Sequence, residues 1–141
     1  MRLKNFAIVC VAACISAALG ATAESQTVIV VSGPTIVAFF EPVSDKVMEK
    51  NADTNEALSD FQLYARQVRG PLQRRSIEFQ ELYASSFRLR DGNRVVLFRL
   101  GKVKVGYYFV APGKKPRIKY GVMTDADILQ MADEYFGIAA R

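Results

Sequence analysis

The sequence of 141 residues has no histidine and no tryptophan, and its two cysteines, Cys10 and Cys14, both stand near the N-terminus. Without histidine the chain cannot build a Ser–His pair, and beyond Cys14 it has no thiol nucleophile. The usual nitrogen and sulfur ligands of zinc, copper and non-haem iron are also missing there. The chemistry that remains is that of carboxylates, Ser–Lys pairs, tyrosine and oxygen-ligated calcium or magnesium. We predict no cofactor and no metal site.

The N-terminus has the pattern of an export signal. Two basic residues, Arg2 and Lys4, precede an uncharged, mostly apolar run at residues 6–19, and small residues follow that run. The run is shorter than the roughly 20 apolar residues that a membrane-spanning helix needs. We therefore interpret residues 1–23 as a signal peptide that is cleaved before Glu24, which makes the mature protein periplasmic or secreted.

Two alternatives to this cleavage remain. The signal could stay uncleaved as a membrane anchor, or Cys14 could be acylated, because residues 11–14 resemble a bacterial lipobox. Residues 15–23 stay apolar, however, where a lipoprotein normally turns polar. Contact with a membrane is expected only in these two cases. A protein that begins at Glu24 has no cysteine and so no disulfide, although an exported protein's compartment would permit one.

Charge is distributed unevenly along the chain. Residues 66–119 hold 14 basic and three acidic residues, a net charge of +11, whereas residues 24–65 have a net charge of −5. A central basic block of this kind suits an anionic partner, either a protein or an envelope component. Nucleic acid is the less suitable partner, because an exported protein rarely meets it. The other interpretation is that these cations cover the solvent faces of strands and discourage edge pairing.

Hydrophobic patterning predicts a single α/β domain over residues 24–141. The run at residues 35–40 is apolar enough for a central strand covered on both faces. A helix is expected from Asp53, which forms a capping-box pattern with Glu56, and its apolar stripe continues to Leu72. The Gly-Pro pair at 70–71 is expected to stop or kink this helix. A second helix is expected from Thr124 to Gly137. Further strands are expected at 27–31, 77–84, 87–90, 94–100, 103–110 and 117–122, with Asp91-Gly92 as a hairpin turn.

Two stretches resemble the thioredoxin superfamily. An apolar strand, residues 36–40, leads through Pro42 to Ser44-Asp45-Lys46-Val47, which falls where that family carries its Cys-x-x-Cys motif. The C-terminal third is similar to the strand, strand, helix ending of the family. The resemblance implies an α/β, single thioredoxin-like domain: a mixed sheet with an added β-hairpin and a C-terminal helix, after the N-terminal signal peptide.

The chain also departs from that family. Val105 and Gly106 stand where the family has a cis-proline, and a hairpin is expected where it usually has a helix. A different α+β domain is the alternative fold. Because thiol–disulfide exchange needs a thiolate, the degenerate loop Pro42, Ser44, Asp45, Lys46 and Val47 is expected to be redox-inactive. Ser44 is expected to cap the short helix or turn that follows.

Tyrosine and basic residues gather near the C-terminal strands. Exposed tyrosine among lysine and arginine is a common composition of protein interfaces. We predict a binding surface that includes Tyr108, Lys114, Lys115, Arg117 and Lys119. On alternating strands, however, half of the aromatic rings must face the core.

Enzymatic alternatives depend on the few reactive groups left. Carboxylates occur in pairs at Asp125/Asp127 and Asp133/Glu134, where helix capping or a solvated face explains them more simply. A Ser44/Lys46 dyad has no neighbouring residues that indicate an oxyanion site. The leading interpretation is an exported, redox-inactive binding protein of the cell envelope. A hydrolase that uses carboxylates or a Ser–Lys pair is the alternative.

Overall fold

The computed structural model describes residues 27–101 and 104–138. The predicted signal peptide, its cleavage site and Cys14 lie outside the described residues. The chain folds as an α/β domain with two mixed sheets and three helices in its described part, which confirms the predicted fold class at this level. The elements are β1 (Val28–Val30), β2 (Thr35–Phe40), α1 (Asp45–Lys50), α2 (Ala52–Arg74), β3 (Glu78–Tyr83), β4 (Ser86–Asp91), β5 (Arg94–Arg99), β6 (Val105–Val110), β7 (Arg117–Tyr120) and α3 (Asp125–Phe136).

The larger sheet has four strands in the order β3-β2-β6-β7. Strands β2 and β3 are parallel and are joined by a crossover that contains α1 and α2, while β6 is antiparallel to both β2 and β7. Every residue of β2 is buried, as its uninterrupted apolar sequence predicts for a strand covered on both faces.

The smaller sheet has the order β1-β4-β5. Strands β4 and β5 form the predicted hairpin, in which Asp91 pairs with Arg94 and Gly92 adopts a φ of 57°, a value that glycine reaches without strain. Strand β1 runs parallel to β4. The hairpin is therefore part of a second sheet instead of an extension of the first.

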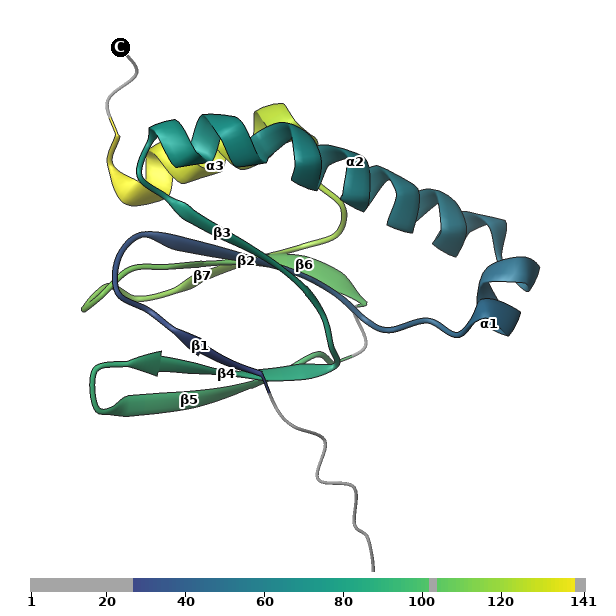
Figure 1. The fold of residues 1–141 in the computed structure, drawn as a ribbon, viewed down its shortest axis with the longest axis horizontal. Coiled ribbons are helices and arrows are strands. Elements are labelled where there is room, and N and C mark those ends of the chain that lie inside the picture. Colours follow the sequence, from purple (N-terminus) through teal and green to yellow (C-terminus); the bar gives the residue numbers. More distant parts are fainter. Residues whose placement is uncertain (1–26, 102–103, 139–141) are drawn as a thin grey trace, which may run out of the picture.

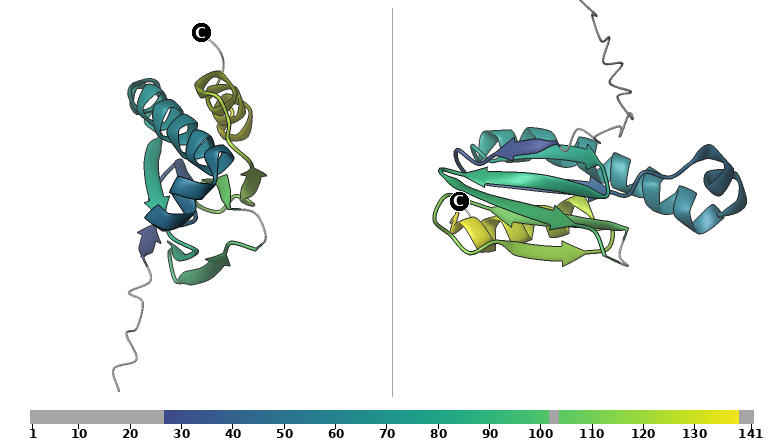
Figure 2. Two further views of the ribbon diagram at one scale, coloured as in Figure 1. Left: turned by 90° about the vertical axis from the view of Figure 1, so that its right-hand side faces the viewer. Right: turned by 90° about the horizontal axis from the view of Figure 1, so that it is seen from below.

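The domain has three layers. Figure 1 shows α2 and α3 above the larger sheet and the smaller sheet below it, and the side view in Figure 2 shows the same order. The N-terminal part of α2 extends past the sheets, with α1 at its far end. None of the helices in residues 27–101 and 104–138 is long and apolar enough to cross a membrane.

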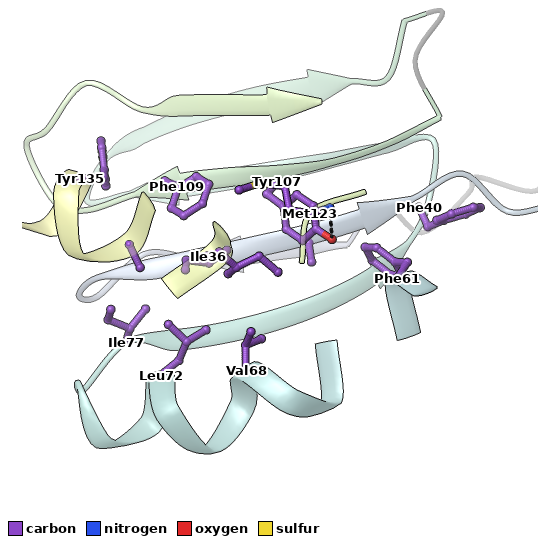
Figure 3. Close-up of a cluster of buried hydrophobic side chains, with 13 residues drawn as sticks. Ile36, Phe40, Phe61, Val68, Leu72, Ile77, Tyr107, Phe109, Met123 and Tyr135 are labelled. Atoms are coloured by element: carbon purple, nitrogen blue, oxygen red, sulfur yellow. Dashed lines mark hydrogen bonds between the residues drawn. The ribbon is translucent and has the colours of Figure 1, made fainter. Parts of the chain in front are cut away.

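The core between the helices and the larger sheet is drawn in Figure 3. The buried stripe of α2 packs here with side chains of β2, β6 and α3. Tyr107 is fully buried, and its hydroxyl accepts a hydrogen bond from the Met123 amide at 3.4 Å (Figure 3). The buried members of this cluster are Ile36, Ala38, Phe40, Phe61, Val68, Leu72, Ile77, Tyr107, Phe109, Met123, Ile128, Ala132 and Tyr135.

A second core fills the space between the two sheets. Its centre is a group of contacting rings, Phe39, Phe87, Phe98 and Tyr108, with centroids 4.9–6.2 Å apart. Tilted and edge-on ring pairs of this kind are the arrangements that aromatic quadrupoles favour. Aliphatic residues complete the cluster around the rings: Ile29, Val31, Val37, Leu89 and Val110.

The start of α2 differs from the prediction, and Pro71 does not stop the helix. The helix begins after Asn51, whose side chain accepts a hydrogen bond from the Thr54 amide at 3.1 Å, so the predicted cap at Asp53 is two residues late. It also continues through Pro71 to Arg74. Proline removes one helical hydrogen bond, but only one turn follows it, and the fully buried Leu72 holds that turn against the core.

The ends of α3 confirm the sequence prediction. The Thr124 hydroxyl accepts a hydrogen bond from the Asp127 amide at 3.2 Å, and Gly137 ends the helix in the left-handed conformation. An ion pair then fastens α3 to the end of α2, since the Arg75 guanidinium lies 2.8 Å from the Asp133 carboxylate. Arg75 is the C-cap residue of α2, a position where a cation is favourable.

Candidate binding surface

The segment predicted to be a degenerate active-site loop lies on the surface. Pro42, Ser44, Asp45, Lys46 and Val47 are all exposed, and α1 buries none of its residues. Ser44 does occupy the N-cap position of α1, as expected, but its side chain makes no capping hydrogen bond. Among the described residues no hydrogen bond joins Ser44 to Lys46. The Ser44 hydroxyl is therefore not polarised by Lys46, and the Lys46 ammonium is exposed, so the geometry does not support a catalytic Ser44/Lys46 dyad.

Three of the predicted binding residues gather in one groove. Lys114, Lys115 and Arg117 line a hollow of about 420 Å³ with Pro116 on the turn and Glu134 and Tyr135 on α3. The turn between β6 and β7 places the lysines, and the start of β7 places the arginine. These three residues lie close together because they are close in the sequence. Glu134 and Tyr135 reach the groove only because α3 packs beside the turn.

Tyr135 organises this groove. Its hydroxyl donates to the Lys115 carbonyl at 2.9 Å, and the Lys114 ammonium donates to the Tyr135 carbonyl. The Lys114 ammonium lies 4.4 Å from the centre of the Tyr135 ring, and the Arg117 guanidinium lies 5.7 Å from it, both within cation–π range. Burial raises the pKa of the Tyr135 hydroxyl, although Arg117 acts in the opposite direction, so the hydroxyl remains a donor at neutral pH.

Lys119 continues the basic row on the same face of β7. Arg117 and Lys119 pair with Phe109 and Tyr107, whose side chains point to the helices, and paired residues share a face. Lys119 lines a second groove of about 370 Å³. Glu134 borders both grooves, so the row of cations runs alongside α3 from one groove to the next.

Tyr108 lies apart from these cations. It belongs to the core between the two sheets, on the opposite face of β6, and only 6% of its surface is exposed. Its pKa is raised by burial, so the hydroxyl is protonated at neutral pH. The structure thus divides the predicted set into a surface row of four cations and one buried tyrosine.

The outer face of the smaller sheet is another exposed surface, and it agrees with the alternative interpretation that cations cover the solvent faces of strands. Arginines occupy its middle strand, at Arg88 and Arg90, and aliphatic side chains flank them on both outer strands. Four of those aliphatic residues are between 41% and 55% exposed: Val28, Val30, Val95 and Leu97. The alternation of Arg88-Leu89-Arg90 indicates a face of this kind, but the partner strands are distant in the sequence.

The carboxylate pairs serve structural roles. The Asp127 amide donates to the N-cap Thr124, and the Asp127 carboxylate accepts from the Thr124 hydroxyl at 2.8 Å. Asp133 is paired with Arg75. In the part of the chain that the structure describes, no group of three or more acidic, histidine or cysteine residues is arranged to hold a metal ion.

The surface row of cations is suited to electrostatic binding. Its grooves are open, and its positive groups outnumber the acidic Glu134 in the groove beside Tyr135. Hydrogen bonds with Tyr135 hold the Lys115 carbonyl and the Lys114 ammonium. Such a surface can hold carboxylates or phosphates of a larger partner. The chain matches no protein-family model, no curated protein and no solved structure, so its function has to be inferred from this geometry.

Proposed function

We propose that the chain is an exported, redox-inactive, thioredoxin-like binding protein, periplasmic or secreted, that holds an acidic protein or an anionic envelope component. The contact surface is the cationic row formed by Lys114, Lys115, Arg117 and Lys119. The observation that carries this proposal is the groove beside Tyr135, where three of the cations converge on one anchored turn.

Fixed cations bind anions better than mobile ones, because less side-chain entropy is lost when the partner arrives. Lys114 is held by the Tyr135 carbonyl and ring, and Arg117 lies over the same ring. Lys115 and Lys119 are exposed beside them and can reach toward a partner. The row therefore combines a preorganised centre with adaptable ends.

The thioredoxin-like part of the proposal is supported by the order of elements. Strand β2 leads into α1 with Ser44 at its N-cap, and β6, β7 and α3 form the strand, strand, helix ending. The β4–β5 hairpin stands where the family usually has a helix. Redox inactivity follows from the residues of the degenerate loop, since Ser44 and Val47 cannot form a disulfide.

A binding experiment with matched charge reversals tests the surface. The exported protein is immobilised and exposed to envelope extract, beside Lys115→Glu/Arg117→Glu/Lys119→Glu and the control Arg88→Glu/Arg90→Glu/Arg99→Glu. Both triple variants change the net charge equally, but the control changes only the smaller sheet. The proposal requires a partner that is lost with the first variant and retained with the second. Equal loss with both would mean that total charge, instead of this row, drives the capture.

The intact mass of the exported product tests its processing. Cleavage after Ala23 leaves a product that begins at Glu24, whereas acylation at Cys14 adds lipid mass to a longer product. An unprocessed chain keeps all 141 residues. Only the first result agrees with a freely diffusing binding protein.

A further inference from the structure

A small cavity lies between the two sheets, and Lys114 is the member of the cationic row that also lines it. It opens where the Asp91–Arg94 turn of the hairpin approaches the turn at residues 111–116, and its volume is about 160 Å³. Its walls are mainly aliphatic, while four polar residues border it. The aliphatic and proline residues are Val31, Leu89, Val96, Val110 and Pro116, and the polar ones are Asp91, Arg94, Tyr108 and Lys114.

A hydrogen bond ties the two turns together at this cavity. The Gly113 amide donates to the Asp91 carboxylate at 3.2 Å. Lys114 contributes to the wall, but its ammonium is directed to the Tyr135 carbonyl on the other side of the turn. Arg94 is exposed at this edge and makes no ion pair with any described residue. The mouth therefore offers one uncommitted guanidinium next to an engaged carboxylate.

Tyr108 gives the cavity a buried hydroxyl without a protein partner. Among residues 27–101 and 104–138, its hydroxyl makes no hydrogen bond, although 94% of the residue is buried. The two neighbouring buried tyrosines are different, because Tyr107 bonds to the Met123 amide and Tyr135 to the Lys115 carbonyl. Buried polar groups almost always have a partner, so an unpaired hydroxyl at a cavity indicates a place for a bound acceptor.

The size of the cavity limits the ligand. An apolar protein cavity of about 150 Å³ accommodates one benzene molecule. The space between the sheets therefore suits a single six-membered ring or a short branched chain. Arginine prefers carboxylates, which its planar fork binds through two parallel hydrogen bonds.

We propose that this cavity binds a small monocarboxylate with one ring or a short branched chain. The apolar body lies against Leu89, Val96 and Val110, the carboxylate pairs with Arg94, and the Tyr108 hydroxyl donates to it. Arg94 supplies the positive charge at the mouth that favours an anion despite Asp91. The cavity shares Lys114 with the cationic row, but the Lys114 ammonium is directed away from it to the Tyr135 carbonyl, so the site does not depend on the proposed function.

Titrations followed by amide chemical shifts test the proposal on the exported protein. The probes are benzoate and isovalerate, with benzyl alcohol and benzylamine as uncharged and cationic controls. We expect saturable shifts for a carboxylate, centred on the residues that line the cavity, and weaker binding of both controls. Benzoate and isovalerate that both fail to saturate, or benzyl alcohol that binds as well as benzoate, would overturn it.

Two substitutions separate the polar contacts. Arg94→Gln should weaken carboxylate binding by about tenfold, the effect of one charge-assisted hydrogen bond, and leave benzyl alcohol unchanged. Arg90→Gln removes the same charge from the outer face of the smaller sheet and should change binding less than twofold. Tyr108→Phe should weaken carboxylates severalfold. Equal effects of Arg94→Gln and Arg90→Gln would show a response to overall charge and would contradict the site.

Discussion

The two faces of the larger sheet are covered in different ways. Helices cover one face, where the buried tyrosines Tyr107 and Tyr135 have hydrogen-bond partners and Arg75 joins α2 to α3. The smaller sheet covers the other face with a core of fewer residues, and Tyr108 there has no partner among the described residues. The helix side therefore satisfies its polar groups, whereas the sheet side retains a cavity. We interpret the first as the stability core and the second as the layer with room for a ligand.

The largest expected loss of stability comes from a substitution in the core between the helices and the larger sheet. Phe61→Ala should lower the free energy of unfolding by about 4 kcal/mol, because the ring is fully buried and its removal leaves a cavity. Phe98→Ala on the sheet side should cost roughly half as much, since Phe98 is only partly buried. Urea unfolding measures both losses. The control is Leu63→Ala on the exposed side of α2, which should change the free energy of unfolding very little. A larger loss for Phe98→Ala would reverse the assignment of the stability core.

The next largest loss of stability is expected from adding a side chain at Gly106 in β6. A side chain at Gly106 would place its Cβ 2.7 Å from the Lys119 carbonyl oxygen and 2.8 Å from the Phe39 ring. Gly106→Ala should therefore cost about 2–3 kcal/mol through overpacking. Gly33→Ala is the matched control, because no atom lies within 4 Å of the Cβ it would add. If thermal unfolding showed both variants alike, the β6–β7 contact would be looser than described.

High pH should lower the stability of the fold through Tyr107, which is buried between the helices and the larger sheet. Burial raises the pKa of Tyr107 to about 12, while an unfolded tyrosine titrates near 10. The unfolded state loses its proton first, so stability is fully present below pH 10 and falls as the pH rises toward 12, by about 2 kcal/mol. Urea unfolding across this range should show that decline, and Tyr107→Phe should make it shallower. Some decline remains, because burial also raises the pKa values of Tyr108 and Tyr135. A decline of the same slope in Tyr107→Phe would assign it to other groups.

The smallest expected difference in stability is between Phe substitutions of the adjacent residues Tyr107 and Tyr108 at neutral pH. Tyr107→Phe should cost about 1 kcal/mol because it leaves the buried Met123 amide without an acceptor. Tyr108→Phe removes a hydroxyl that has no partner in the described structure and should be neutral or slightly stabilising. The measurement is the midpoint of thermal unfolding for each variant. Equal losses would indicate that Tyr108 bonds to an ordered water molecule in the cavity.

Local signals in the sequence predicted local features well. The apolar run of β2, the Asp91-Gly92 turn and the Thr124 cap are each defined by neighbouring residues, and each was confirmed. The start of α2 was predicted two residues late because both Asn51 and Asp53 are good N-cap residues. Its end was left open because the apolar stripe continues to Leu72 past Pro71, and the burial of Leu72 outweighs the effect of the proline. A cap or a stop is therefore predictable only where no distant packing competes with it.

Features that depend on distant contacts could not be predicted. Nothing in β6 shows that Tyr107 faces the helices and Tyr108 the other sheet, because either register keeps an aromatic residue inside. The parallel pairing of β1 with β4 joins segments far apart in the chain. For the site, the sequence predicted the cations of the β6–β7 turn, but Glu134 and Tyr135 reach the groove only through the packing of α3.

The arginines around β5 have a consequence for solubility. This edge strand carries Val-Val-Leu-Phe at residues 95–98, and an apolar run on a free edge is a template for aggregation. Arg94 and Arg99 bound the run on both sides, and Arg88 and Arg90 face outward from the adjacent strand. Two copies that approach through this sheet bring like charges together before their strands can pair. We therefore expect these arginines to oppose aggregation through the apolar edge of this sheet.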